Sequence, residues 1–127
     1  MPDETMIEKI APLTVDRFEI ASAGPRTVVL KGELALRDPV AELGPHLRRI
    51  HDAAAGGGEL VIDVRPLAYV NSSGLRIFLD WVAWISAEPA ERRYRLAFQL
   101  AKKSTWQAAA FPAIAMLGGD AVRTETL

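Results

Sequence analysis

An apolar segment that runs directly into a serine-containing helix start constrains the fold of this chain more than any other feature. Leu60–Asp63 has the character of a buried strand, and a turn containing Pro66 follows it. Asn71-Ser72-Ser73-Gly74 then opens an apolar helix that runs to Ser86. Free backbone N–H groups and the helix dipole favour an anion or a phosphorylated hydroxyl at such a position. The sequence therefore predicts an α/β fold with a site at this helix start.

The composition limits the classes of function that remain. The chain has 127 residues, half of them hydrophobic, a formal net charge of −1 and no cysteine. It is long enough for one domain with a real core, and it carries neither a basic field for nucleic acid or anionic lipid nor a thiolate. No stretch approaches the roughly 20 apolar residues that span a bilayer, and the first residues lack a secretory pattern. We expect a cytoplasmic protein with no metal and no cofactor of its own.

Periodicity and turn signals predict the remaining elements. Residues 1–14 are expected to be a loose lead-in with at most one short strand, and residues 15–127 a single domain. The expected elements are strands at Phe18–Ala21, Thr27–Gly32, Glu59–Val64, Tyr94–Leu100 and Ala121–Thr124, and helices after Asp38, after Ser72 and over Ser104–Leu117. Pro45 either kinks the first helix or marks its true start, and Gly56-Gly57-Gly58 ends it. The order β-β-α-β-α-β-α, with a last short β, implies a mixed four- to five-stranded sheet covered by helices.

The helix after Ser72 is apolar on two faces. At about 100° per residue, one face carries Leu75, Phe78, Leu79, Val82 and Ile85. The other carries Ile77, Trp81 and Trp84. We expect the first face to lie on the core, and at least one indole of the second to be exposed and covered by a partner or a second copy. Packing against a neighbouring helix is the alternative for the second face.

The sequence offers little for catalysis. Ser72 and Ser73 follow a strand, but their neighbours do not form the Gly-x-Ser-x-Gly of a hydrolase elbow. His46 and His51 fall on different faces of one helix, and neither is expected to pair with an acid or to share a metal. We therefore predict no enzyme and no catalytic residue, with a small serine hydrolase using Ser72 as a remote alternative.

Two motifs resemble those of STAS domains, the family of anti-sigma-factor antagonists. Gly32-Glu33-Leu34 is similar to the Gly-Glu-Leu that follows the second strand in that family. Leu60–Leu75 is similar to the family signature of an apolar strand, a short turn and an acid-Ser-Ser/Thr-Gly helix start. Asn71-Ser72-Ser73-Gly74, with the later Trp106-Gln107, resembles a STAS-like subfamily known from cyanobacterial regulators, in which Asn replaces the acid. The resemblance covers about residues 15–125.

The resemblance implies a phosphorylation-gated binding domain. In the family, the first Ser or Thr after the acid accepts phosphate from a partner kinase that is often also an anti-sigma factor. That residue is Ser72 here, with Ser73 as the second choice, and a phosphatase resets the switch. Asn71, and Ala35 after Gly-Glu-Leu, stand where family members commonly have acids. The implied partner-binding residues are Glu33, Asn71, Ser72, Ser73, Gly74, Ile77, Trp81 and Trp84.

Two alternatives to this switch remain. Ser72 or Ser73 is only the helix N-cap, since serine caps helices well. The second alternative is an unphosphorylated scaffold or dimerisation module of the same fold, pairing through Ile77, Trp81 and Trp84.

Overall fold

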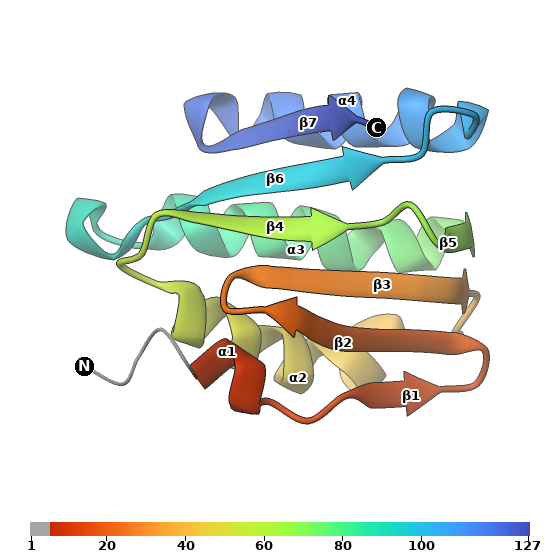
Figure 1. The fold of residues 1–127 in the computed structure, drawn as a ribbon, viewed down its shortest axis with the longest axis horizontal. Coiled ribbons are helices and arrows are strands. Elements are labelled where there is room, and N and C mark those ends of the chain that lie inside the picture. Colours follow the sequence, from red (N-terminus) through yellow and green to blue (C-terminus); the bar gives the residue numbers. More distant parts are fainter. Residues whose placement is uncertain (1–5) are drawn as a thin grey trace.

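Seven strands form one mixed sheet, and the three long helices all lie on one side of it (Figure 1). The computed structural model describes residues 6–127. The strands are β1 Leu13–Val15, β2 Phe18–Gly24, β3 Thr27–Leu34, β4 Glu59–Asp63, β5 Leu67–Val70, β6 Arg95–Leu100 and β7 Val122–Thr126. The helices are α1 Met6–Lys9, α2 Pro39–Ala54, α3 Ser72–Ala87 and α4 Thr105–Leu117, with 3-10 turns η2 Ala90–Arg92 and η3 Gly119–Ala121.

The strand order is β1-β2-β3-β4-β6-β7, with β5 pairing with β3 beyond the end of β4. The pairs β1–β2 and β2–β3 are antiparallel, and the others are parallel. The α/β class is confirmed, whereas the expected four to five strands are too few, because β1 and β5 add to the sheet. With three and four residues respectively, these two strands are too short to show a period-two pattern.

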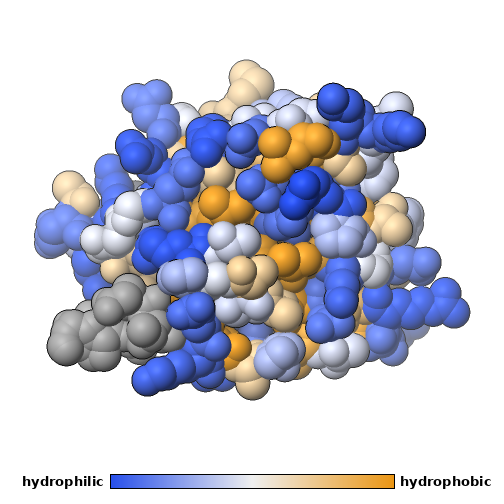
Figure 2. All heavy atoms as spheres, viewed as in Figure 1, coloured by the Kyte–Doolittle hydropathy of each residue, from blue (hydrophilic) through white to orange (hydrophobic). Residues whose placement is uncertain are grey.

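The two faces of the sheet differ in what covers them. Side chains that point toward the helices are buried, and they include Leu30, Ile62 and Phe98. On the opposite face, Val29 and Val61 are only partly buried. Figure 2 shows this uncovered face, with apolar residues near its middle surrounded by hydrophilic ones. Because successive residues of a strand alternate between faces, one set builds the core and the other meets solvent.

The predicted helix boundaries hold closely. The Asp38 side chain accepts a hydrogen bond from the Ala41 nitrogen at 3.3 Å, and Pro39 begins α2. Pro45 lies inside one continuous α2, so it does not mark a separate helix start. α3 lies between α2 and α4, and α4 lies behind β7 at the edge of the sheet (Figure 1). Across residues 6–127, no helix has both the length and the hydrophobicity needed to cross a bilayer.

The segment before β2 belongs to the packed fold from residue 6 onward. Ile7 on α1 is only 1% exposed and lies in the core. The expectation of a loose segment is therefore wrong for residues 6–14, because α1 packs against β2 and α2, whereas the one short strand expected there is present as β1. For residues 1–5 the same expectation lies outside the described part of the chain.

Candidate functional site

Asn71 is the residue that caps α3. Its Oδ1 accepts a hydrogen bond from the Gly74 nitrogen at 2.7 Å, and its Nδ2 donates one to the Leu36 carbonyl at 3.3 Å. The amide therefore satisfies one of the free N–H groups of the first turn and ties the helix start to the chain after β3. The alternative in which Ser72 or Ser73 is the N-cap is wrong, since both serines lie one and two positions further along the helix.

Ser72 and Ser73 occupy the first two positions of α3, and both are exposed. Among the described residues, neither hydroxyl takes part in a hydrogen bond. A serine at these positions can accept a phosphate without breaking any contact that holds the helix. The phosphate would lie beside the first-turn N–H groups and the positive end of the helix dipole.

Gly74 allows the start of α3 to approach the sheet closely. A Cβ at this position would lie 2.8 Å from Val70 Cγ1 and 2.9 Å from Leu34 Cγ, closer than nonbonded carbons approach. Gly74 is itself buried, so it has a packing function and offers a partner no side chain. A contact between a partner protein and Gly74 stays a prediction, and it can involve only the Gly74 backbone.

Glu33 is brought near this helix start by the pairing of β3 with β5. It lies opposite Tyr69, and its carboxylate is 3.6 Å from the Arg17 guanidinium. The preceding Gly32 has φ +94°, and a Cβ there would collide with the Arg17 carbonyl oxygen, so this bend in β3 requires glycine. Tyr69 is 51% exposed and was missed by the sequence reasoning, because β5 was taken as a turn. We call Glu33, Tyr69, Ser72 and Ser73 the α3 N-terminal surface.

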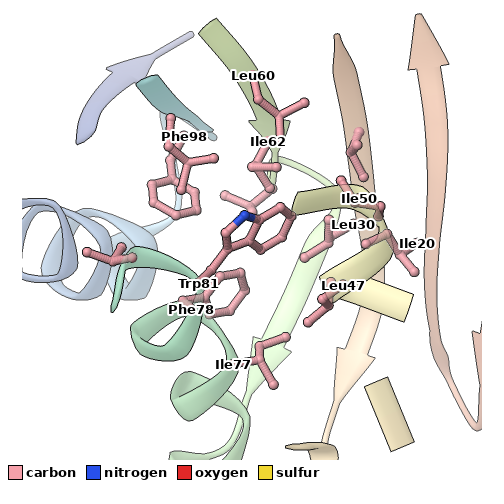
Figure 3. Packing of buried hydrophobic residues seen from close by; sticks show 14 of the residues in the cluster. Ile20, Leu30, Leu47, Ile50, Leu60, Ile62, Ile77, Phe78, Trp81 and Phe98 are labelled. Atoms are coloured by element: carbon pink, nitrogen blue, oxygen red, sulfur yellow. The ribbon is translucent and has the colours of Figure 1, made fainter. Parts of the chain in front are cut away.

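Ile77 and Trp81 do not lie on the surface. Their exposed fractions are 2% and 0%, and Figure 3 shows Ile77 pointing toward Leu47 of α2 and the Trp81 ring lying beside Ile62 and Leu30 of the sheet. The expectation that they are free to meet a partner is wrong, because α3 is the middle of three helices and packs against α2 along this flank. The helical projection placed Ile77 and Trp81 on one apolar face, but it could not tell which neighbour covers that face.

Trp84 is the partial exception on this flank. It is partly buried, with its ring 5.7 Å from the His51 ring and 5.2 Å from the Arg48 guanidinium carbon. A contact between Trp84 and a partner stays a prediction. The predicted core face also needs correction at Leu79, which is 37% exposed, while Phe78 packs edge-on against Phe98 and Phe111.

A buried hydrogen-bonded chain that the sequence reasoning missed joins α2, α3 and the start of β6. Trp81 Nε1 donates to the Tyr94 hydroxyl at 2.8 Å, and that hydroxyl lies 2.8 Å from His51 Nδ1. His51 Nε2 lies 2.8 Å from Glu88 Oε2. The expectation that neither histidine pairs with an acid is therefore wrong for His51. The partners are 37 and 43 residues from His51 in sequence, so no local pattern could reveal them.

Only one arrangement of protons satisfies every group in this hydrogen-bonded series of side chains. Tyr94 O–H donates to His51 Nδ1, and His51 Nε2–H donates to the Glu88 carboxylate. Burial raises the pKa of the Tyr94 hydroxyl above its ordinary range, so it keeps this proton. The hydrogen bond from His51, together with Arg92, lowers the pKa of Glu88. Every buried donor and acceptor in this series therefore has a hydrogen-bond partner, and the series stabilises the packing of α3 against α2.

The same proton arrangement argues against a metal ion here. Ligand atoms of His51, Asp52 and Glu88 lie within 4.8 Å of one another. Metal binding at His51 Nε2 would force the ring proton onto Nδ1, and the buried Tyr94 hydroxyl would then lose its acceptor. These residues therefore fit a structural hydrogen-bonded chain better than a metal site.

Gln107 and Asp63 fix the turn before the α3 N-terminal surface. Gln107 Nε2 donates to the carbonyls of Val64 and Leu67 at 2.7 and 3.0 Å, and its Oε1 accepts from the Ala101 nitrogen at 2.8 Å. Gln107 is 1% exposed, so its amide makes these hydrogen bonds inside the fold. Hydrogen bonds from Arg65, the first at 2.9 Å from its Nε, lower the pKa of Asp63. These hydrogen bonds therefore hold the turn between β4 and β5 in one conformation.

Neither histidine is placed to serve Ser72 as a base. His51 meets Glu88 just past the C-terminal end of the 16-residue α3, about 24 Å along the helix from Ser72. His46, on α2, lies beside Ile7, Ile20 and Val28, and none of these residues belongs to α3. The arrangement of residues 6–127 thus gives the remote hydrolase reading no support.

Comparison with protein-family models, with curated proteins and with solved structures gives no match for this chain. The resemblance to STAS domains therefore rests on the motifs in the sequence alone.

Proposed function

We propose that the chain is a STAS-like regulatory domain whose contact with a partner protein is gated by phosphorylation of Ser72. One observation carries this proposal: Asn71 caps α3, so the exposed Ser72 hydroxyl is free at a helix N-terminus. The proposed partners are a serine/threonine kinase of the anti-sigma type and a cognate phosphatase.

The physical basis of the gate is local charge. A phosphate on Ser72 adds about −1.5 to −2 charges to the α3 N-terminal surface. The other side chains of that surface are those of Glu33, Tyr69 and Ser73. The α3 cap does not depend on the Ser72 hydroxyl, so the domain stays folded in both states. A partner that fits this surface when it is unmodified then meets a desolvated dianion when it is modified, and binding is lost.

The test compares Ser72→Ala with Ser72→Asp as baits in lysate from cells that make the protein. The matched control is Ser86→Asp, the same change at an exposed serine near the other end of α3. We expect Ser72→Ala to capture a kinase that Ser72→Asp captures at least about tenfold less, equivalent to about 1.4 kcal/mol. Ser86→Asp should retain most of the binding. The captured kinase should then phosphorylate the wild type with ATP but leave Ser72→Ala unmodified. Equal capture by Ser72→Ala and Ser72→Asp would contradict the gate.

A further inference from the structure

The outer edge of β7 presents a row of backbone groups to solvent. β7 ends the strand order and pairs with β6 alone among the described strands. Leu127 both donates to the Leu100 carbonyl at 3.0 Å and accepts from the Lys102 nitrogen at 3.1 Å, so its backbone faces β6. Since the backbone groups of successive strand residues point to alternate sides, those of Val122, Thr124 and Thr126 point outward. β7 contains no proline, and an edge of this kind is a template for another strand.

The sequence of β7 is complementary to itself. An antiparallel pair of β7 strands with its two-fold axis at Thr124 places Thr124 opposite Thr124 of the second copy. The three outward-facing residues then form hydrogen-bonded pairs. In the same register, Arg123 of each copy faces Glu125 of the other, at positions where cross-strand side chains come closest. Arg123 uses Nε and Nη2 to bind Glu59 in its own chain, and its Nη1 lies 3.9 Å from Glu125 of the same chain. Both side chains lie on the open face of the sheet, so in the pair Glu125 exchanges this long contact for the facing Arg123 of the second copy.

The helix beside this edge has an outer surface without charge. α4 lies behind β7 in Figure 1, and residues 104–119 contain no charged side chain. Its exposed residues are Thr105, Ala108, Ala109, Pro112, Ala113, Met116 and Leu117. Met116 is 82% exposed and Leu117 is 67% exposed. A surface helix normally carries charged residues on its solvent side, so this face is typical of one that another surface covers.

We propose that two copies of this chain form a two-fold symmetric dimer through antiparallel β7–β7 pairing, with their α4 helices side by side. The two-fold axis is perpendicular to the sheet, which places both α4 helices on the same side and brings their uncharged faces together. Charge complementarity between Arg123 and Glu125 identifies a second copy as the occupant of this edge. The dimer extends the sheet on the side away from β3 and β5, so the α3 N-terminal surface stays open (Figure 1).

The experiment measures molar mass by sedimentation equilibrium over a concentration series. The wild type should shift from the 13.9 kDa of one chain toward twice that mass as its concentration rises. Glu125→Arg places two arginines opposite each other, and Arg123→Glu places two glutamates opposite each other. Each variant alone should therefore stay monomeric, but an equal mixture restores both opposite-charge pairs and should form a heterodimer. Glu91→Arg, on exposed η2, makes the same charge change outside β7 and α4 and should dimerise like the wild type.

Two further variants separate failure to fold from failure to pair. Thr124→Pro removes an outward N–H that the fold does not use, and Met116→Lys places a charge on the α4 face. Both should keep the far-UV circular dichroism of the wild type while losing the dimer. A wild type that stays monomeric up to about 1 mM would overturn the proposal, even if an added peptide binds along β7 as an extra strand. A dimer that survives Glu125→Arg and Thr124→Pro, or a variant mixture that does not pair, would overturn it as well.

Discussion

Asn71 Oδ1 lies 2.7 Å from the backbone nitrogen of Gly74, and this bond makes an amide, not a serine hydroxyl, the cap of α3. The same side chain reaches the Leu36 carbonyl through Nδ2. One residue therefore holds the helix start in place and leaves Ser72 and Ser73 unencumbered. The separation of capping from the candidate phosphosite is what lets the surface change charge without a change of fold.

Asn71→Ala should destabilise the domain by about 1 kcal/mol, the usual loss for a missing cap. Asn71→Asp keeps the capping oxygen and loses only the bond to Leu36, so it should stay folded and cost less than the alanine variant. Urea unfolding followed by circular dichroism gives both values. Unfolding of Asn71→Asp at neutral pH would show that the donated hydrogen bond is indispensable, contrary to this view.

Trp81→Ala should cost about 3–5 kcal/mol, because it empties a fully buried site and removes the donor to Tyr94. Trp84→Ala, at a partly exposed site on the same helix, should cost clearly less. Chemical denaturation of the two variants side by side tests the contrast. Equal losses would mean that the two indoles are buried to the same degree in solution.

Tyr94→Phe should destabilise the domain by about 1–3 kcal/mol, because it leaves Trp81 Nε1 and His51 Nδ1 buried without partners. Tyr69→Phe makes the same chemical change at an exposed site and should be close to neutral. Thermal melts at one pH compare the two. If both tyrosines tolerate the change equally, the buried chain contributes no net stability.

Asp63→Asn should lower stability at neutral pH and lose that effect in acid. Arg65 lowers the pKa of Asp63 in the folded state, so the ion pair stabilises the fold above the unfolded carboxyl pKa of about 3.9. The contribution is lost as the pH falls through the lower folded-state pKa. Unfolding free energies of wild type and variant should therefore differ by a constant amount between about pH 5 and 8 and converge below about pH 4. A gap that persists at pH 2 would contradict this origin.

Local signals predicted α2 and α3, but not β5, which places Glu33 and Tyr69 near the start of α3, and not the long-range contacts. Capping residues and glycine stops at Asp38 and Gly56 located α2, and the motif at Asn71 located the start of α3. The covering of Trp81 depends on α2 lying beside α3, which the sequence of α3 does not encode. The partners of His51 come from residues 37 and 43 positions away, so its burial appears only when the chain has folded.

Phosphosite mapping by mass spectrometry, on protein isolated from cells that make it under several growth conditions, tests the central claim most directly. The account predicts a phosphate on Ser72 in a fraction of the chains, and no phosphate on this peptide in cells that carry Ser72→Ala. Ser72 and Ser73 unmodified in every condition, with the peptide that contains them fully detected, would contradict it.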